Sequence, residues 1–493
     1  MLRDWKLNLK VVLNRSSPTA IYLQIAQVII QEIRRGRLLP GSVLPGSREL
    51  ASELGVNRKT IINVYDELTA QGWLASNGTK GTFVSSSLPL MSDATIDQRS
   101  PRNHSKPAGP QFKRLTKIEE LDVTFPEPGL FCLDDGTPDT RLFPVEHFAR
   151  AYRSIMLLGA RTGKLTYGDP RGSLALRQAI SKMLNVDRGL ATTADNICLT
   201  RGSQMAIYVT AKALIHSGDT AVVEELTYPP AREVFRSMGA SVLRIRLTEL
   251  GPDLDQFEAT CRRHPVRLVY LTPHHHFPTT RLLRADQRLR LLALAEQFGF
   301  SILEDDYDHE FHFQRQPLLP LASIDPSKVV YIGSLSKLLS PHLRIGYLAA
   351  PANVIERAAR EIMIIDRQGD QIAEAAVAEL IESGELRRHA RKALSIYTRR
   401  RDRLALLLEK EIGAAVNFRP PDGGLAFWLT FGDLRHLDRL EERAPSIGMK
   451  LLPSRSFSGT ADGPRGLRVG FAGLNDAELG EAVKRLKSGI GVT

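Results

Sequence analysis

The chain has 493 residues, which is more than one ordinary domain and predicts at least two hydrophobic cores. Hydrophobic residues make up 43% and charged residues 25%, a globular composition that excludes wholesale disorder. Because it has no long apolar run, no secretory signal and only three scattered cysteines, we expect a cytoplasmic protein without a membrane partner. The net charge is +11, and residues 1–86 hold 11 Lys and Arg against 6 Asp and Glu, which favours an anionic polymer as partner.

Residues 1–86 have the pattern of a small helical module followed by a hairpin. Apolar residues recur at helical spacing over 21–33, and a second, short helix is expected over 47–55. A third helix begins after Asn57, a good N-cap residue. Short apolar runs around an Asn-Gly turn predict a hairpin over 73–84. Together these elements predict a winged helix-turn-helix.

The third helix carries polar and basic side chains at its N-terminal end, where a recognition helix enters the major groove of DNA. An amphipathic surface helix would explain this face alone, but the turn, the hairpin and the local charge favour double-stranded DNA. A basic side chain at the start of the preceding helix is expected to hold a phosphate. The expected DNA-contacting residues are Arg48, Arg58, Lys59, Thr60, Asn63 and Lys80.

The module resembles the GntR-type DNA-binding domain in the stretch PGSVLPGSRELASELGVNRKTIINVYDELTAQGWL and in GTKGTFV. The resemblance implies that Arg48, Arg58 and the wing residue Gly81 lie at the DNA. Residues 87–122 then lose any helical or strand period and are rich in Ser, Pro and charge, so we expect a flexible linker. The linker would lead into a body formed by residues 123–493.

The body alternates short, apolar, β-rich runs with helical patterns. This alternation predicts an α/β fold with a mainly parallel sheet that is covered by helices on both faces. Binding sites on such sheets gather at the carboxyl ends of the strands. Strands are predicted at 196–199, 220–224, 242–247, 268–271, 301–303 and 329–332, with helices such as 204–216 and 285–298 between them.

One segment combines a lysine with hydroxyl and guanidinium groups directly after a predicted strand. Lys337 lies among small hydroxyl residues and precedes Arg344 by seven positions. An aldehyde cofactor needs a lysine amine for covalent attachment, and hydroxyl and cationic groups for its phosphate. A loop lysine is usually a solvated surface group, but this spacing favours a cofactor. We therefore expect Lys337 to hold the aldehyde, and Ser334, Ser336 and Arg344 to hold the phosphate.

Other strand ends carry residues that suit the same cofactor. Asp305 could hold the proton on a pyridine nitrogen, with Tyr307 beside the ring oxygen, although an Asp after a strand is often a cap or a metal ligand. Ser203 and Gln204 open a helix after a strand and suit a phosphate; an ordinary helix cap is the alternative. Tyr228 could stack on a planar ring or serve only in packing.

Two further features concern the surroundings of the ring. Three consecutive histidines at 274–276 diverge on a strand, which disfavours zinc, and we favour His275 facing the ring or its substituents. Arg468 lies in an apolar, strand-like stretch over 466–471, and an inward-pointing arginine needs an anion. Since its planar fork suits a carboxylate, we expect Arg468 to bind an effector acid group; an exposed arginine paired with a nearby acid is the alternative.

These segments together are similar to fold-type I pyridoxal 5'-phosphate (PLP) enzymes of the aminotransferase family, with a smaller C-terminal α+β part. With the GntR-type module in front, the chain resembles the MocR/GabR-type transcriptional regulators. The resemblance implies PLP that is attached to Lys337, paired with Asp305 and bound through its phosphate by Arg344. It also implies a homodimer in which Tyr167 reaches the phosphate of the neighbouring subunit. The chain departs from the family pattern at Thr280, where Gly is usual.

Three functions are compatible with these features. Our main hypothesis is a transcriptional regulator that senses an amino acid, an amine or PLP, because a metabolic enzyme has no evident use for a recognition helix. The alternative is a working PLP-dependent aminotransferase with an accessory DNA-binding module, in which Lys337, Asp305 and Tyr307 would be catalytic. A DNA-binding scaffold that has lost its cofactor is disfavoured, because these three residues and Arg344 are all retained.

Overall fold

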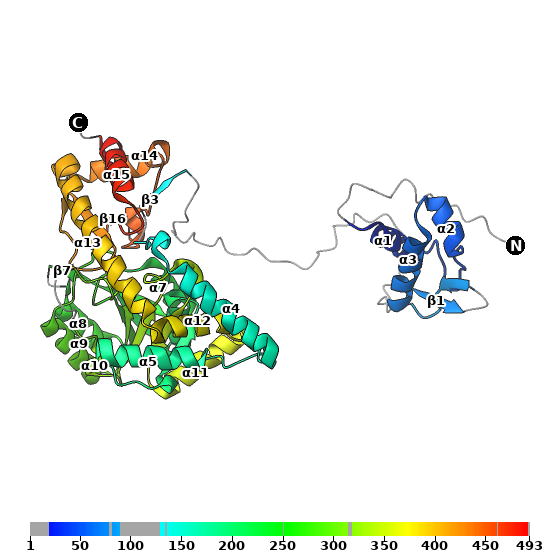
Figure 1. Cartoon of the computed structure of the whole chain (residues 1–493), viewed down its shortest axis with the longest axis horizontal. Coiled ribbons are helices and arrows are strands. Elements are labelled where there is room, and N and C mark those ends of the chain that lie inside the picture. Colours follow the sequence, from blue (N-terminus) through cyan, green and yellow to red (C-terminus); the bar gives the residue numbers. More distant parts are fainter. Residues whose placement is uncertain are drawn as a thin grey trace. The chain divides into compact units, whose positions relative to one another are not determined.

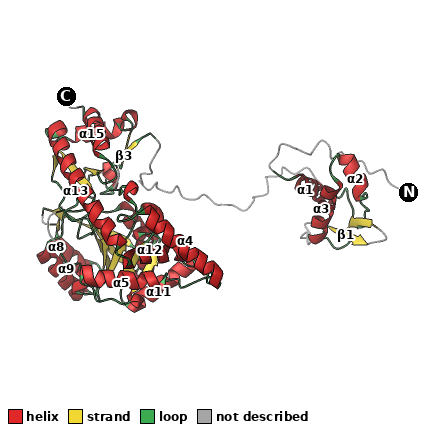
Figure 2. Cartoon of the chain, viewed as in Figure 1, coloured by secondary structure: helices red, strands yellow, loops and turns green. Residues whose placement is uncertain are grey.

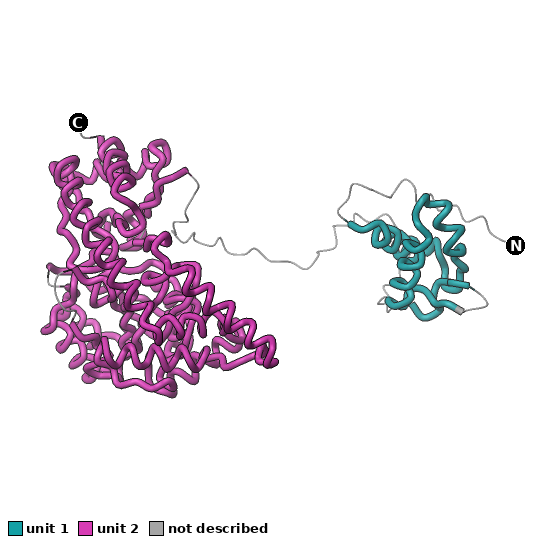
Figure 3. Tube along the Cα trace, in the orientation of Figure 1, with its two compact units in different colours: residues 1–116 teal, residues 117–493 magenta. Residues whose placement is uncertain are grey.

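The chain divides into two compact units, Met1–Thr116 and Lys117–Thr493 (Figure 3). The predicted linker at 87–122 lies almost wholly outside the described residues, so the expected boundaries after residues 86 and 122 stay predictions. The computed structural model describes residues 19–77, 81–88, 129–133, 136–249, 251–313, 318–460 and 462–491.

The N-terminal unit is a three-helix cluster with a two-stranded antiparallel hairpin, the winged helix-turn-helix that the sequence predicts. Its core includes the fully buried Ile29, Leu50 and Val64, one from each helix. Gly55 ends the second helix in the left-handed conformation, and the Asn57 side chain accepts a backbone N–H that begins the third. The elements are α1 (Ile21–Arg34), α2 (Ser47–Leu54), α3 (Arg58–Ala70), β1 (Leu74–Asn77) and β2 (Gly81–Val84).

A seven-stranded sheet forms the centre of the C-terminal unit (Figure 1). Its strand order is β4-β12-β11-β10-β9-β5-β6, and all neighbours are parallel except β12, which runs antiparallel to both β4 and β11. The sequence pattern predicts the other six strands but not β12. The strands are β4 (Ile197–Thr200), β5 (Thr220–Glu224), β6 (Ser241–Ile245), β9 (Val266–Leu271), β10 (Ser301–Asp306), β11 (Val329–Ser334) and β12 (Gly346–Ala349).

Helices cover both faces of this sheet (Figure 2). Successive strand side chains point to opposite faces, so Val222 joins the cluster under α5, α8, α9 and α13, while Val223 joins the cluster under α6, α7 and α11. The helices are α4 (Val145–Thr162), α5 (Leu174–Arg188), α6 (Ser203–Leu214), α7 (Pro229–Ser237), α8 (Leu254–Arg263), α9 (Ala285–Phe298), α10 (Leu321–Ile324), α11 (Ala352–Ile365), α12 (Gln371–Glu382) and α13 (Glu385–Ile412).

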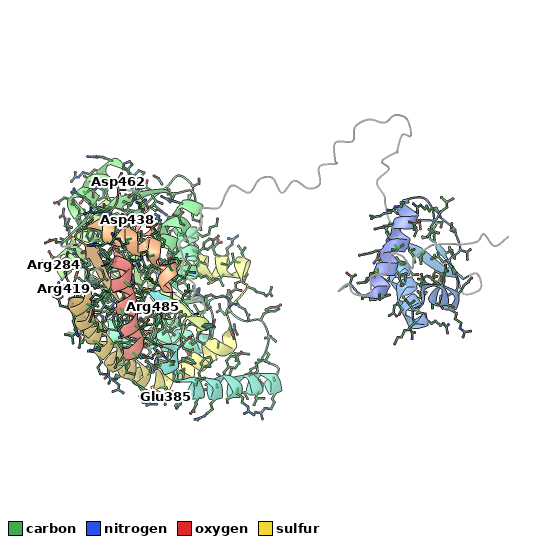
Figure 4. All side chains as sticks on the ribbon, turned by 90° about the horizontal axis from the view of Figure 1, so that it is seen from above. Arg284, Glu385, Arg419, Asp438, Asp462 and Arg485 are labelled. Atoms are coloured by element: carbon green, nitrogen blue, oxygen red, sulfur yellow. The ribbon has the colours of Figure 1, made fainter. Side chains whose placement is uncertain are left out.

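The long helix α13 leads into the smaller α+β part that ends the chain. There a three-stranded antiparallel sheet, β13-β14-β16, packs with α14 and α15. Figure 4 labels Asp438 and Arg485 on these two neighbouring helices. The remaining elements are β3 (Phe131–Leu133), β7 (Leu247–Thr248), β8 (Gly251–Pro252), β13 (Val416–Phe418), β14 (Ala426–Phe431), α14 (Leu434–Arg443), β15 (Met449–Leu451), β16 (Leu467–Gly470) and α15 (Asp476–Ile490).

Candidate functional site

Residues at the ends of several strands of the large sheet meet in one cleft. They come from the carboxyl ends of β4, β5, β9, β10 and β11, where parallel topology places the binding sites of such sheets. Strand order, rather than nearness in the sequence, therefore brings these segments together. The cleft is lined by Ser203, Tyr228, Tyr270, Thr272, Phe277, Asp305, Tyr307 and Lys337.

Lys337 lies in the turn after β11 and is half-buried. Its Nζ donates a hydrogen bond to the carbonyl oxygen of Gly136 at 3.1 Å. Gly136 has a φ of 95°, and a Cβ there would lie 3.0 Å from the Cβ of Leu425, so glycine suits this close approach. The lysine amine is thus held in the cleft through a neutral acceptor.

Asp305, near the end of β10, is buried in the cleft wall. The Tyr270 hydroxyl donates to its Oδ2 at 2.8 Å, while its Oδ1 has no hydrogen-bond partner among the described residues. Burial raises the pKa of this carboxyl to about 7; Asp306 and Asp308 add to the rise, and Tyr270 and Lys337 oppose it. A cationic N–H donor in the cleft would satisfy Oδ1 and favour the ionised carboxylate.

The start of α6 and the turn before β12 form a cradle for an anion. A Cβ on Gly346 would lie 2.6 Å from the carbonyl carbon of Gly202, so the backbone at the start of β12 packs directly against the backbone before α6. The Arg344 guanidinium donates at 2.8 Å to a carbonyl just before α6, and no side chain caps that helix. Ser336 Oγ is buried without a hydrogen-bond partner in the described part, and its N–H bonds to Ser334 Oγ at 3.2 Å. These donors suit a phosphate group.

Aromatic rings form the remaining walls of the cleft. Tyr228 and Phe277 pack edge to face with their centroids 5.3 Å apart, and the Tyr307 hydroxyl donates to the carbonyl oxygen of His275 at 3.0 Å. The structure does not place the His275 side chain in the cleft lining; its Nδ1 lies 2.6 Å from Asp308 Oδ1 instead. Phe277, two residues further along the chain, is in the cleft lining.

Arg468, on β16, is 1% exposed and is therefore not a surface arginine. It donates from Nη1 to the carbonyl oxygen of Pro278 at 2.7 Å and from Nη2 to the Tyr307 hydroxyl at 3.3 Å. Its guanidinium carbon lies 4.6 Å from the centroid of the Phe277 ring. The C-terminal part thus places a buried cation beside two residues of the cleft lining.

Besides His275, five more of the expected cofactor residues lie outside this lining: Ser334, Ser336 and Arg344 of the cradle, and Gln204 and Tyr167. Gln204 is on the first turn of α6, and its Oε1 is buried without a hydrogen-bond partner in the described ranges. Tyr167 is 73% exposed, and the guanidinium carbon of Arg367 lies 3.9 Å from the centroid of the Tyr167 ring. Tyr167 is therefore accessible to a second molecule rather than directed at the cleft of its own chain.

The N-terminal unit presents its expected DNA-contacting residues on one helix and the elements around it. Arg48, Lys59, Asn63 and Gly81 are exposed, and Thr60 is half-buried. The exposed Arg58 at the start of α3 donates to Ser47 Oγ at 3.3 Å, which ties α3 to α2. Lys80 lies outside the described residues.

Comparison with known families matches both units of the chain. The family described as aminotransferase class I and II matches residues 130–486. The chain belongs to this family. The family described as bacterial regulatory proteins, gntR family, matches residues 21–84, so a gntR domain precedes the aminotransferase domain. Aminotransferases of this fold are PLP-dependent.

Several regulators are similar to the chain over nearly its whole length. The probable rhizopine catabolism regulatory protein MocR of Rhizobium meliloti is 28% identical over 97% of this chain and 95% of its own length. The pyridoxine biosynthesis transcriptional regulator PdxR of Corynebacterium glutamicum is 27% identical over 97% and 99%. The transcriptional regulator TauR of Rhodobacter capsulatus is 28% identical over 94% and 95%.

Solved aminotransferase structures share the fold of the aminotransferase domain. Kynurenine aminotransferase of Pyrococcus horikoshii superposes with a TM-score of 0.68 at 26% identity, over 74% of this chain and 91% of its own. The α-aminoadipate aminotransferase LysN of Thermus thermophilus gives the same TM-score and identity, over 74% and 92%. Within the described ranges, no helix is long and apolar enough to cross a bilayer.

The close packing at Gly346 predicts that adding one methyl group there lowers the affinity for PLP. Gly346→Ala should weaken PLP binding at least about tenfold, because the new Cβ would push β12 away from the start of α6, where we expect the phosphate to be held. Titration of the cofactor-free protein with PLP, followed by absorbance, measures this. Gly480→Ala is the control, since a Cβ there meets open space on α15. Equal PLP affinity for the Gly346 variant and the parent would contradict the placement of the cradle.

The raised pKa of Asp305 predicts a pH-dependent stability difference. Since the folded pKa lies near 7, above the ordinary 3.8, this carboxyl stabilises the cofactor-free fold at low pH and loses that contribution as the pH rises through about 7. Asp305→Asn should therefore raise the melting temperature of the cofactor-free protein by a few degrees at about pH 8 and change it less at about pH 5. The same variant should bind PLP more weakly. A melting difference that is equal at both pH values would contradict the assignment.

Proposed function

We propose that this chain is a DNA-binding transcriptional regulator that holds PLP through Lys337 and responds to a small amine or amino acid. The observation that carries the proposal is the presence, in one chain, of a gntR domain and an aminotransferase domain whose cleft retains the groups a PLP molecule needs. The similarity to regulators over almost the full length supports the same conclusion.

The cleft fits PLP at three separate points. Asp305 Oδ1 is a buried acceptor that a protonated pyridine nitrogen would satisfy. Ser336, Arg344 and the uncapped start of α6 would hold the phosphate, and the glycine contact at Gly346 leaves no space there for a side chain. Lys337 supplies the amine for covalent attachment. When bound, PLP offers an aldehyde that condenses with amines.

An effector amine would compete with Lys337 for that aldehyde. The exchange would release the Lys337 amine, which could then return to the carbonyl of Gly136. If the effector also carries a carboxylate, Arg468 is placed to receive it, because its guanidinium already lies beside Tyr307 and Phe277. Binding of this kind would shift the protein between two conformations that differ in their affinity for DNA.

A homodimer is part of the proposal. Met363, Ile364 and Ile365, at the end of α11, are exposed apolar side chains. Two positions after Ile365, Arg367 packs on the exposed Tyr167. An apolar patch of this kind is typical of an interface, and a second copy covering it would bring Tyr167 toward the neighbouring cleft.

Binding to operator DNA would use the exposed face of α3 and its neighbours. Arg58 and Lys59 occupy the start of the recognition helix, where side chains reach base edges in the major groove. Arg48 lies at the start of α2 and would contact the phosphate backbone.

An aminotransferase with an accessory DNA-binding module is the second candidate. The retention of Lys337, Asp305, Tyr307 and Arg468 in one region favours it, since turnover would use the same groups. The two functions differ in product: an aminotransferase releases a keto acid from the effector, whereas a sensor returns it unchanged. The gntR domain makes regulation the better-supported proposal.

The role of Lys337 predicts the colour of the protein. Protein with PLP should be yellow, and borohydride reduction should leave the cofactor bound irreversibly to Lys337. Lys337→Ala should stay folded and lose the reducible attachment, while Lys328→Ala, just before β11, should behave like the parent. Absorbance spectra and peptide mass spectrometry measure these outcomes. A Lys337→Ala protein with the parent's spectrum would contradict the proposal.

The DNA interface predicts two different losses. Arg58→Ala should cost about 1–3 kcal/mol in operator binding and relax sequence preference, because a base contact is removed. Arg48→Ala should weaken all DNA sequences alike and reduce the salt dependence, because a phosphate contact is removed. Fluorescence anisotropy with operator and unrelated DNA at several salt concentrations separates the two. Parent-like binding by both variants would contradict this placement of α3.

The placement of Arg468 predicts a selective loss of effector binding. Arg468→Ala should keep the cofactor colour and basal DNA binding but bind an amino-acid effector about tenfold more weakly or worse, because a charged hydrogen bond is lost. Arg465→Ala is the control, since Arg465 pairs with Asp438 and Glu441 instead. Effector titration by absorbance measures the affinity. Unchanged affinity in the Arg468 variant would remove this residue from the site and favour an effector without a carboxylate.

A further inference from the structure

A second cavity lies between α5, the end of α12 and the start of α13, apart from the cleft that contains Lys337. Its volume is about 570 Å³, which is enough for a small organic molecule. The inner wall is apolar and includes the buried Ala179, Leu338 and Leu386. Figure 4 labels Glu385, the first residue of α13, which lies between the lining residues Gly384 and Leu386 in the sequence.

Glu310 is the acidic lining residue of this cavity that is not on its exposed edge. The Glu310 side chain is only 12% exposed, and neither of its oxygens has a hydrogen-bond partner among the described residues. Its ion-pair contact is with His309 Nε2 at 3.5 Å. Burial raises the pKa of Glu310, and the charges of Asp306 and Asp308 add to the rise, while His309 and the backbone N–H of Glu310 itself oppose it. A buried carboxylate with so few donors is costly, and a cationic donor would reduce that cost.

The other charged groups of the cavity lie at its exposed edge and balance one another. Arg387 on α13 donates to Asp187 on α5 at 3.0 Å. Lys182 and Glu382 are exposed lining residues of opposite charge. The edge therefore neither attracts nor repels a cation strongly, and Glu310 remains the buried charge that a ligand would meet inside.

We propose that this cavity binds a small amine with an apolar body, whose ammonium group donates to Glu310 and whose hydrocarbon part packs against Ala179, Leu338 and Leu386. A neutral hydrocarbon would leave both carboxylate oxygens without donors. An anion would be placed against a buried carboxylate. An ammonium group on an apolar body matches both the charge and the wall.

The position of the cavity connects it to the cleft. Leu338 directly follows Lys337, and its carbonyl oxygen lies 2.7 Å from His389 Nε2 on α13. Gly384, with a φ of 75°, joins α12 to α13, the helix that leads to the C-terminal part and Arg468. A ligand in the cavity would contact both the Lys337 turn and the start of α13. Its occupancy and the occupancy of the cleft would then be coupled, each altering the affinity of the other.

A tertiary amine tests the site without involving the cofactor. N,N-dimethylcyclohexylamine cannot condense with an aldehyde, so its binding is independent of Lys337 chemistry and of the proposed regulatory function. Isothermal titration calorimetry on the full-length protein with PLP should detect it, with cyclohexanol and cyclohexanecarboxylate at least about tenfold weaker. Absence of binding at millimolar amine, or equal binding of the three compounds, would overturn the proposal.

Variants place the amine within the cavity. Glu310→Gln should weaken binding at least about tenfold, and Ala390→Leu, which fills the cavity from α13, should do the same without altering Glu310. Glu379→Gln removes a negative charge from an exposed position on α12 outside the lining and should retain the parent's affinity. Parent-like affinity in either the Glu310 or the Ala390 variant would overturn the proposal; the Ala390 variant decides if the Glu310 variant does not fold.

Discussion

The burial of the Asp305 carboxyl at the end of β10 is the constraint on which the rest of the cleft depends. Parallel pairing with β9 and β11 fixes this position inside the sheet, where an ionised carboxyl with an unused oxygen is costly. The Tyr270 hydroxyl offsets part of the cost. A protonated ring nitrogen would offset the rest, so the group that destabilises the cofactor-free fold is the one that would hold the cofactor in place. Such trade-offs between stability and function are expected at binding sites.

The other groups of the cleft follow from that anchor. A ring fixed at Asp305 would lie between walls formed by Tyr228 and Phe277, and Lys337 belongs to the same lining. Arg468 approaches from the C-terminal part and bonds to Tyr307, so an effector held there would contact both parts of the aminotransferase domain. Exchange of one amine for another would therefore alter contacts on both sides of the cleft, which is the physical basis of the proposed sensing.

Sequence patterns predicted the residue positions that the strand topology determines. They did not predict the positions that side-chain packing determines. Because parallel strands end at the same edge, the strand-end positions of Asp305, Tyr228 and Lys337 were sufficient to predict one cleft. The strand β12 is only four residues long and antiparallel, and its pattern did not distinguish it from a loop. The side chain of His275 bonds to Asp308, a partner that only the folded loop reveals, and Phe277 rather than His275 is in the cleft lining. The cavity at Glu310 brings α5 next to α12 and α13, which lie far from it in the sequence, so no local motif marks it.

Simultaneous measurement of the cofactor and of DNA binding tests the central claim most directly. DNA selected by the full-length protein from a random pool would be labelled, and its affinity followed by anisotropy while an amine effector is titrated and the cofactor absorbance is recorded. We expect the DNA affinity to change at least about fivefold over the same amine concentrations at which the absorbance changes. A complete change in absorbance with unaltered DNA affinity, accompanied by keto-acid release, would contradict a regulatory role for the cleft.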